Sequence, residues 1–156
     1  MRIGSGGEPV KGKKAAGIFF TDGHKVLLLK RSQEGDHGGT WALPGGKAKD
    51  GESEISNAIR ETKEECGLGS IPGYRIDSLS SHNGHQKFTG FVYRVTEPFQ
   101  IRLSKEHTDW DWVDLNNLKS KDLHPKFKEQ IPRYISAIKR KINKFSEWVQ
   151  YRESVS

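Results

Sequence analysis

Residues 46–68, GKAKDGESEISNAIRETKEECGL, constrain the fold more than any other stretch of the chain. After the turn at Asp50-Gly51, Ile55, Ala58, Ile59, Thr62 and Cys66 recur at steps of three and four, which predicts a helix with one buried face. Gly67 follows, at the position where a residue that tolerates positive φ commonly ends a helix. The segment therefore predicts a loop, then an amphipathic helix that stops at Gly67.

Three glutamates lie beside this predicted buried face. Glu61, Glu64 and Glu65 are spaced i, i+3, i+4, so their carboxylates are expected to converge on one patch. Like charges at this spacing cost a helix roughly 0.2–0.5 kcal/mol per pair, a cost that a bound cation would offset. Three carboxylates form a hard donor set that suits Mg²⁺ or Mn²⁺ better than zinc or copper. The alternative interpretation is a solvated acidic face on a surface helix.

The spacing of the charged and glycine residues is more specific than that of a general acidic helix. Gly46, Glu52 and the run Arg60-Glu61-Thr62-Lys63-Glu64-Glu65-Cys66-Gly67-Leu68 resemble the signature box of the Nudix hydrolases at every charged and glycine position. Seven fixed residues at roughly 6% usage each match by chance in on the order of one window in 10⁸ to 10⁹. The one departure is Thr62, where the family prefers a larger aliphatic residue.

The resemblance implies a divalent-metal-dependent hydrolase that cleaves a phosphoanhydride bond in a nucleoside diphosphate linked to another group. It implies that the Gly46 carbonyl, Glu61, Glu64 and Glu65 hold Mg²⁺ or Mn²⁺. It also implies that Arg60 holds a catalytic glutamate by a salt bridge, and Glu64 is in reach one turn further along the helix. We therefore expect Glu64→Gln and Glu65→Gln to lower turnover by orders of magnitude without loss of the fold.

One more acidic residue is expected from outside the box. Nudix enzymes often supply a further metal ligand or general base from the region that here contains Glu106, and either Glu61 or Glu106 is the expected proton acceptor. A solvated loop glutamate is the alternative for Glu106, and the adjacent His107 is less favoured. Glu52 is expected to support the junction between loop and helix.

Several residues outside the glutamate cluster are candidate substrate contacts. Lys30 and Arg31 end an apolar strand, and Lys47 follows the glycine pair of the box. His124 and Phe127 could stack on a base, or they could pack at the start of a helix. The alternative for Lys30 and Arg31 is a plain solvated strand end.

The rest of the chain predicts mixed strands and a second helix. Strands are expected at residues 15–20, 26–29, 74–82, 86–96 and 109–113. Asn83-Gly84 is expected to form a hairpin turn that requires positive φ. A helix is expected from about residue 126 to 149. Residues 115–127 read as an irregular connection. The expected class is α/β (α+β): an α/β/α sandwich with a mixed central sheet, a catalytic loop–helix and a long C-terminal helix.

Length and composition bound the organisation of the molecule. A chain of 156 residues suits one domain, placed at residues 15–150, with residues 1–14 as a flexible basic arm. The single cysteine, Cys66, fits a reducing compartment, and neither a spanning apolar run nor a secretory signal is visible, so a cytoplasmic protein without membrane contact is expected. A monomer or a homodimer fits equally well.

The net charge of +6 favours anionic partners. A nucleotide is the favoured partner, and nucleic acid, which the basic arm and the C-terminal helix could contact, is less favoured. The leading substrate class is a (d)NTP, cleaved to NMP and pyrophosphate. Alternatives are a dinucleoside polyphosphate, an RNA 5′ end, or ADP-ribose or another nucleotide sugar, and a remote alternative is a non-catalytic nucleotide-binding module. Lys126 and Phe127 stand where enzymes for oxidised purines carry acidic or amide residues, which disfavours that specificity.

Overall fold

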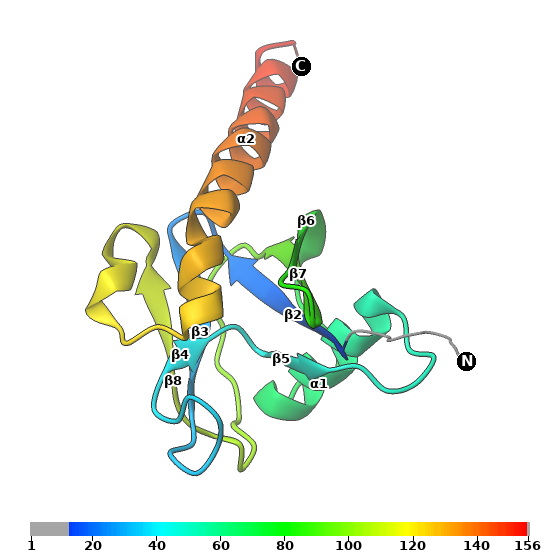
Figure 1. The fold of residues 1–156 in the computed structure, drawn as a ribbon. Coiled ribbons are helices and arrows are strands. Elements are labelled where there is room, and N and C mark those ends of the chain that lie inside the picture. Colours follow the sequence, from blue (N-terminus) through cyan, green and yellow to red (C-terminus); the bar gives the residue numbers. More distant parts are fainter. Residues whose placement is uncertain (1–12, 156) are drawn as a thin grey trace.

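The fold is a mixed β-sheet with helices on both faces (Figure 1). The structure, a computed structural model, describes the backbone of residues 13–155 and the side chains of residues 13–141. The strands are β2 (Lys13–Thr21), β3 (Lys25–Arg31), β4 (Trp41–Ala42), β5 (Gly45–Lys47), β6 (Tyr74–His82), β7 (Gln86–Arg94) and β8 (His107–Asp114). The helices are α1 (Glu54–Cys66), the short 3₁₀ helix η1 (Leu115–Ser120) and α2 (Pro125–Val155).

The strand order brings β5 and the start of β8 into one sheet. The main path is β4-β3-β2-β7-β6, with β5 paired to β2 and β8 paired to β3. β2 is parallel to β7, and the other pairs are antiparallel. The register places Ala16 opposite Gly46 and Arg31 opposite His107. The mixed central sheet predicted from the sequence is confirmed.

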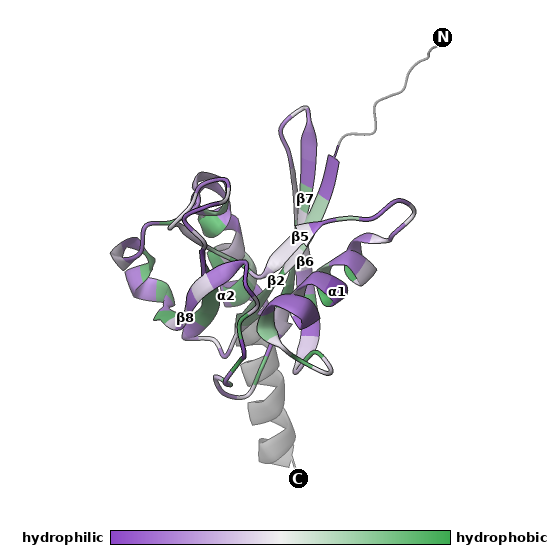
Figure 2. Cartoon of the chain, turned by 90° about the horizontal axis from the view of Figure 1, so that it is seen from below, coloured by the Kyte–Doolittle hydropathy of each residue, from purple (hydrophilic) through white to green (hydrophobic). Residues whose placement is uncertain are grey.

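Side chains of β2 alternate between two hydrophobic cores. Phe19 packs in one core with Tyr134 of α2, and the two rings are stacked with centroids 4.6 Å apart. Ile18 packs in the other core with Ala58 and Cys66 of α1. The two helices therefore cover opposite faces of the sheet, as the predicted α/β/α sandwich requires. Figure 2 shows hydrophobic segments in the sheet between the helices and a hydrophilic tip on the β6–β7 hairpin.

α1 begins and ends where the sequence predicts. The Ser53 hydroxyl accepts a hydrogen bond from the Ser56 N–H at 3.2 Å, and Gly67 ends the helix in the left-handed region, with φ 64° and ψ 36°. Of the predicted buried stripe, Ala58, Thr62 and Cys66 are buried, but Ile55 and Ile59 are only partly buried. Instead, the acidic Glu65 and the amide Asn57 lie inside. Burial also raises the pKa of the Cys66 thiol to about 12.

The start of β2 and the turn between β6 and β7 differ from the predictions. β2 begins at Lys13, because Lys13 and Lys14 pair with Gln86 and Lys87 of β7 and so belong to the sheet and not to the predicted arm. The remainder of that arm, residues 1–12, lies outside the described residues. The β6–β7 hairpin is confirmed, but the expectation of positive φ at both turn residues is wrong.

The hairpin turn uses glycine and the Asn83 side chain in different ways. Gly84 has φ 88°, whereas Asn83 does not adopt positive φ. The Asn83 side-chain oxygen instead accepts hydrogen bonds from the N–H groups of His85 and Gln86, at 3.3 and 2.9 Å. Asparagine therefore acts here through its side chain and glycine through its backbone.

α2 is longer than predicted, and it is fixed to the β6–β7 hairpin by polar contacts. It starts at Pro125, a favourable first helical residue, and continues past Pro132 to Val155. Four of its side chains reach the hairpin: Lys126 contacts Gln86, Gln130 contacts Ser81, Arg133 contacts the Ser80 carbonyl, and Arg140 contacts Asp77. Residues 115–120, expected to be irregular, form η1. Among the residues that the structure describes, no helix combines the length and apolar composition needed to cross a membrane.

Candidate active site

A cavity of about 700 Å³ opens where β5, α1, the segment before β8 and the start of α2 meet. Most of the residues proposed from the sequence as site residues line it: Gly46, Glu61, Glu65, Glu106, Arg31, Lys47, His124 and Phe127. These residues come from segments that are far apart in the chain. The sheet register therefore assembles the site.

Glu65 is the most deeply buried carboxyl group of the cavity. Its residue is only 4% exposed, and its Oε1 accepts a hydrogen bond from the Gly45 N–H at 2.8 Å. Burial raises the pKa of Glu65 to about 9, against the opposing effect of the Gly45 hydrogen bond, and Glu61 and Glu106 raise it further by repulsion. In the absence of a cation, Glu65 therefore carries a proton at neutral pH.

Glu61 lies directly against the backbone of Gly46. A Cβ atom at residue 46 would overlap the Glu61 carboxylate, so only glycine lets this side chain reach the cavity. Burial raises the pKa of Glu61, although the neighbouring Arg60 guanidinium acts in the opposite direction. The contact places the Glu61 carboxylate beside the loop whose Gly46 carbonyl the sequence proposes as a metal ligand.

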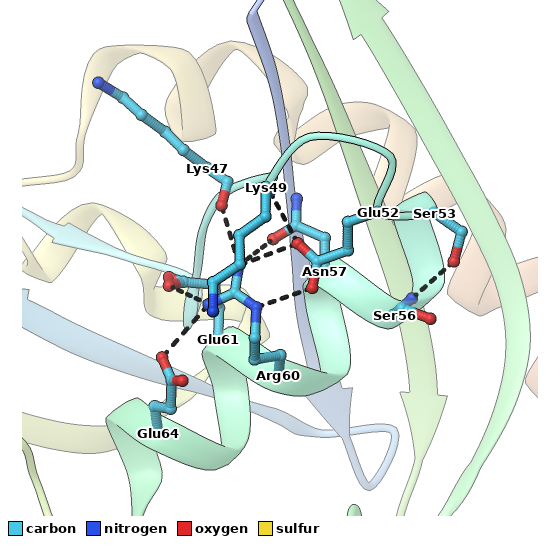
Figure 3. Close-up of polar contacts among 9 residues, drawn as sticks. All are labelled: Lys47, Lys49, Glu52, Ser53, Ser56, Asn57, Arg60, Glu61 and Glu64. Carbon is cyan, nitrogen blue, oxygen red and sulfur yellow. Dashed lines mark hydrogen bonds and ion pairs between the residues drawn. The ribbon is translucent and has the colours of Figure 1, made fainter.

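Arg60 is the centre of a polar network that ties the loop to α1 (Figure 3). Its Nε and Nη2 donate to the two oxygens of Glu52 at 2.7 and 3.0 Å, and Nη2 also donates to the Lys47 carbonyl at 3.1 Å. Glu52 in turn accepts from the Lys49 N–H at 2.9 Å. The Arg60 guanidinium lowers the pKa of Glu52 to about 2. Glu52 thus supports the loop–helix junction, as expected from the sequence.

Arg60 also contacts two glutamates of the box. Its Nη1 lies 3.2 Å from Glu61 Oε1 and 3.4 Å from Glu64 Oε1 (Figure 3). The Glu64 side chain is 59% exposed and does not line the cavity, so the structure brings together the carboxylates of Glu61 and Glu65 but not that of Glu64. Lys30, on β3, is likewise absent from the cavity lining. The proposed roles of Glu64 and Lys30 remain predictions.

Glu106 and His107 approach Glu65 from the start of β8. One ligand atom from each of these three side chains lies within 4.8 Å of the others. Burial lowers the pKa of His107, and its Nδ1 is buried without a hydrogen-bond partner among the described residues. Sequence reasoning ranked His107 low, because a single histidine beside a loop glutamate carries no spacing signal. Its approach to Glu65 depends on the pairing of β3 with β8.

Two histidines lie close together, and one of them, His124, lines the cavity. The rings of His37 and His124 lie 4.4 Å apart, and His37 Nδ1 is 3.1 Å from a carboxylate oxygen of Asp36. Burial, with His37 and Arg31 nearby, lowers the pKa of His124 to about 4. Asp36 and His37 were not predicted as site residues.

Phe127 contributes mainly to a hydrophobic core. It is 5% exposed and packs near Phe19 and Tyr134, with ring centroids 6.4 and 6.2 Å apart. This favours the packing alternative for Phe127 over an open stacking surface. The side chains of Phe88, Gln86 and Gln130 also line the cavity and were missed by the sequence analysis.

The donor set of the cavity suits a hard divalent cation. Glu61, Glu65 and Glu106 supply carboxylate oxygens, and Gly46 brings a backbone carbonyl to the same lining. Oxygen donors of this kind match Mg²⁺ or Mn²⁺. A raised pKa in a buried carboxyl cluster is also the pattern expected where a cation neutralises the site when bound.

Comparison with protein families and with known proteins gives one consistent result. The NUDIX domain model matches residues 11–134. A Mycobacterium tuberculosis protein provisionally named 8-oxo-dGTP diphosphatase 3 is 30% identical over 124 residues, covering 72% of this chain and 57% of that protein. The pig (Sus scrofa) asymmetrical bis(5′-nucleosyl)-tetraphosphatase is 31% identical over 101 residues, covering 59% of this chain and 65% of that enzyme. This chain thus spans less than two thirds of each relative.

A solved structure agrees with these matches at the level of the fold. A Nudix hydrolase from M. smegmatis, RenU, superposes with a TM-score of 0.69 at 24% identity, covering 78% of this chain and 82% of that one. At this identity the superposition supports the architecture of sheet and helices and does not bear on the substrate.

Proposed function

The chain belongs to the Nudix family, and from this we propose that it is a divalent-metal-dependent pyrophosphohydrolase acting on nucleotides. The leading substrate class is a (d)NTP, cleaved to NMP and pyrophosphate. Two relatives support nucleotide chemistry, since one is named for 8-oxo-dGTP and the other for a bis(5′-nucleosyl) tetraphosphate.

One observation carries the proposal: Glu61, Glu65 and Glu106 face a single cavity that basic residues also line. Its volume, about 700 Å³, falls in the range of roughly 300–1,000 Å³ typical of small-molecule sites. Arg31 and Lys105 share that lining and would offset the charge of a polyphosphate. An acidic cluster for a cation beside basic residues for phosphate is the arrangement that this reaction requires.

The residues of the cavity can be given roles from their positions. When bound, the divalent cation would neutralise charge on the diphosphate and lower the pKa of the attacking water. Glu65 and Glu106 would hold the cation, with the Gly46 carbonyl. Glu61 would accept the proton of water, because it faces the same cavity while Arg60 fixes its carboxylate. Glu106 is the alternative proton acceptor, and Glu64, on the cavity exterior, is a further ligand if its exposed side chain turns inward.

Part of the cavity lining suits a nucleobase. Phe88 supplies an apolar surface, and Gln86 and Gln130 supply amides that can donate or accept hydrogen bonds at a base edge. The Lys126 ammonium, which can only donate, contacts Gln86 Oε1 and leaves the Gln86 NH₂ group for another partner. A base that presents an acceptor to Gln86 fits this arrangement.

The test is hydrolysis of a nucleotide panel with Mg²⁺ or Mn²⁺, with the products resolved by chromatography. The panel holds the common and oxidised dNTPs, ADP-ribose, a dinucleoside polyphosphate and a triphosphorylated RNA. NMP and pyrophosphate from one or more dNTPs is the expected result. Selective cleavage of another panel member would replace the substrate class, and binding without any turnover would contradict the enzymatic proposal.

Variants of the acidic residues test the assignment of the site. Glu61→Gln and Glu65→Gln should each lower kcat by about 10²-fold or more, because they remove a proton acceptor and a cation ligand. Glu64→Gln separates the two interpretations of its exposed side chain, since a comparable loss would mean that it turns inward. Glu129→Gln, on the exposed face of α2, is the matched control and should keep wild-type kcat. Wild-type turnover in folded Glu65→Gln protein would contradict the assignment.

A further inference from the structure

His107 is a half-buried histidine whose Nδ1 atom is buried and has no partner in the described part of the chain. Its side chain belongs to a group with Glu65 and Glu106 in which one ligand atom from each residue lies within 4.8 Å of the others. An unpaired buried nitrogen is costly, so the Nδ1 of a histidine grouped with two carboxylates calls for a partner that the described residues do not supply. A cation bound by the carboxylates would be such a partner.

We propose that His107 is a nitrogen ligand of the divalent cation held by Glu65 and Glu106, and that this site prefers Mn²⁺ to Mg²⁺. The inference rests on the proposed function in one respect, that a divalent cation binds in this cavity. The inference adds a ligand that the signature box does not contain. It also adds a preference for Mn²⁺ over Mg²⁺, which three carboxylates alone would not determine.

The backbone around His107 holds the side chain in place for this role. His107 pairs with Arg31 across the β3–β8 ladder, and the neighbouring Glu106 carbonyl accepts a hydrogen bond from the Ser32 N–H at 3.1 Å. Both proposed ligands from this segment therefore sit at the start of a strand that is fixed on β3. Ligands on such rigid elements are positioned more precisely than ligands on free loops.

A second cluster that contains histidines does not offer an equivalent site. Asp36, His37 and His124 also bring their ligand atoms within 4.8 Å of one another. However, His37 Nδ1 is engaged with Asp36 at 3.1 Å, and His124 Nδ1 accepts the Lys126 N–H at 3.1 Å. With Nδ1 accepting, a neutral His124 carries its proton on Nε2, which removes that nitrogen's lone pair from metal binding. His107 has no such engagement among the described residues.

The preference follows from the mixed donor set. Mg²⁺ binds oxygen ligands and retains much of its water, whereas imidazole nitrogen favours first-row transition ions. Replacing one oxygen donor by His107 nitrogen should therefore strengthen Mn²⁺ binding relative to Mg²⁺. The same reasoning predicts that removal of the imidazole reduces the difference between the affinities for Mn²⁺ and Mg²⁺.

The test uses Mn²⁺ as a spectroscopic probe bound to the full chain. Electron spin-echo envelope modulation of the Mn²⁺-loaded wild type should show coupling to a directly bound ¹⁴N nucleus. His107→Asn should abolish this coupling and raise the Kd for Mn²⁺ by about tenfold or more, with the Kd for Mg²⁺ changed much less. His124→Asn, which changes another histidine of the cavity lining, should retain the coupling. Coupling that is absent from the wild type, or that survives in His107→Asn, would overturn the proposal.

Two further measurements keep the outcome interpretable. Far-UV circular dichroism of His107→Asn and of a second variant, His107→Gln, checks that each variant is folded, so that a loss of coupling cannot be due to unfolding. The hydrolysis panel is run in parallel. Coupling without turnover supports the His107 ligand and contradicts the proposed enzyme, whereas turnover without coupling supports the enzyme and overturns the His107 ligand.

Discussion

At the scale of single residues, Glu65 shows how the site balances burial against charge. The carboxyl is 4% exposed, and burial raises its pKa to about 9. The signature box predicted Glu61 and Glu65 at the site, because helical spacing fixes their relation within one element. The family resemblance also proposed Glu106 as a site residue. Neither signal predicted that Glu106 and His107 lie against Glu65, since that contact depends on strand pairing between residues distant in the sequence.

Glu65→Gln should make the cation-free protein more stable than wild type at alkaline pH. The folded state retains the Glu65 proton up to about pH 9, whereas the unfolded chain releases it near pH 4.5. The stabilisation is therefore complete below pH 4.5 and is lost as pH rises through 9. Glutamine remains neutral, so the variant should gain on the order of a few kcal/mol relative to wild type by pH 9.

Urea unfolding with a chelator at pH 5, 7 and 9 measures this difference. The free energies of unfolding of the two proteins should be similar near pH 5 and diverge as the pH increases. A constant offset at all three values would mean that the Glu65 carboxyl is not protonated in the folded protein.

At the scale of elements, α1 follows its sequence closely in its ends and less closely in its packing. Ser53 and Gly67 define the helix as local rules predict. The buried face, however, includes Glu65 and leaves Ile59 partly exposed. Hydrophobic periodicity could not reveal this, because it assigns acidic residues to solvent and the inward position of Glu65 reflects the site.

Thr62→Val should stabilise the packing of α1. Thr62 is fully buried, and its hydroxyl has no partner among the described residues, so valine removes the cost of desolvating that hydroxyl while preserving the branched shape. A gain of about 1 kcal/mol in the free energy of unfolding is expected. This position is also the one departure of the box from the pattern that it resembles.

Thr89→Val is the matched control for that substitution. Thr89 is buried as well, but its hydroxyl donates to Glu54 and lies 3.2 Å from the Ser80 hydroxyl. The same chemical change should therefore destabilise the protein at residue 89. Equal losses at both positions, measured by chemical denaturation, would show that the Thr62 hydroxyl is satisfied after all.

At the scale of the whole molecule, the cavity is lined by residues from elements that are far apart in the chain. Gly46 and Glu65 reach it from β5 and α1, while Glu106 and His107 reach it from the β8 side. Periodicity and the hairpin turn predicted most strands and both long helices. The sequence did not reveal which strands would be neighbours, and this register determines the non-box residues of the site.

Cation binding should therefore raise the stability of the entire domain, and more strongly at higher pH. A ligand at about 100 times its Kd stabilises the folded state by about 2.7 kcal/mol. Binding must displace the Glu65 proton, so affinity for Mn²⁺ should rise from pH 6 to pH 8. Differential scanning calorimetry at fixed Mn²⁺ should show a Tm shift that grows across this range. A shift independent of pH in wild type, or an equal pH dependence in Glu65→Gln, would contradict this linkage.

The burial of Cys66 has a practical consequence for experiments that measure conformational change with probes attached to cysteine. It is the single cysteine of the 156-residue chain and is fully buried at the end of α1, with a thiol pKa of about 12. At pH 7 only on the order of one thiol in 10⁵ is ionised, and the thiolate is the species that maleimides and methanethiosulfonates attack. The natural sequence therefore already provides a silent background for site-directed labelling, and a cysteine introduced on the cavity rim can carry a fluorophore without prior removal of the native one.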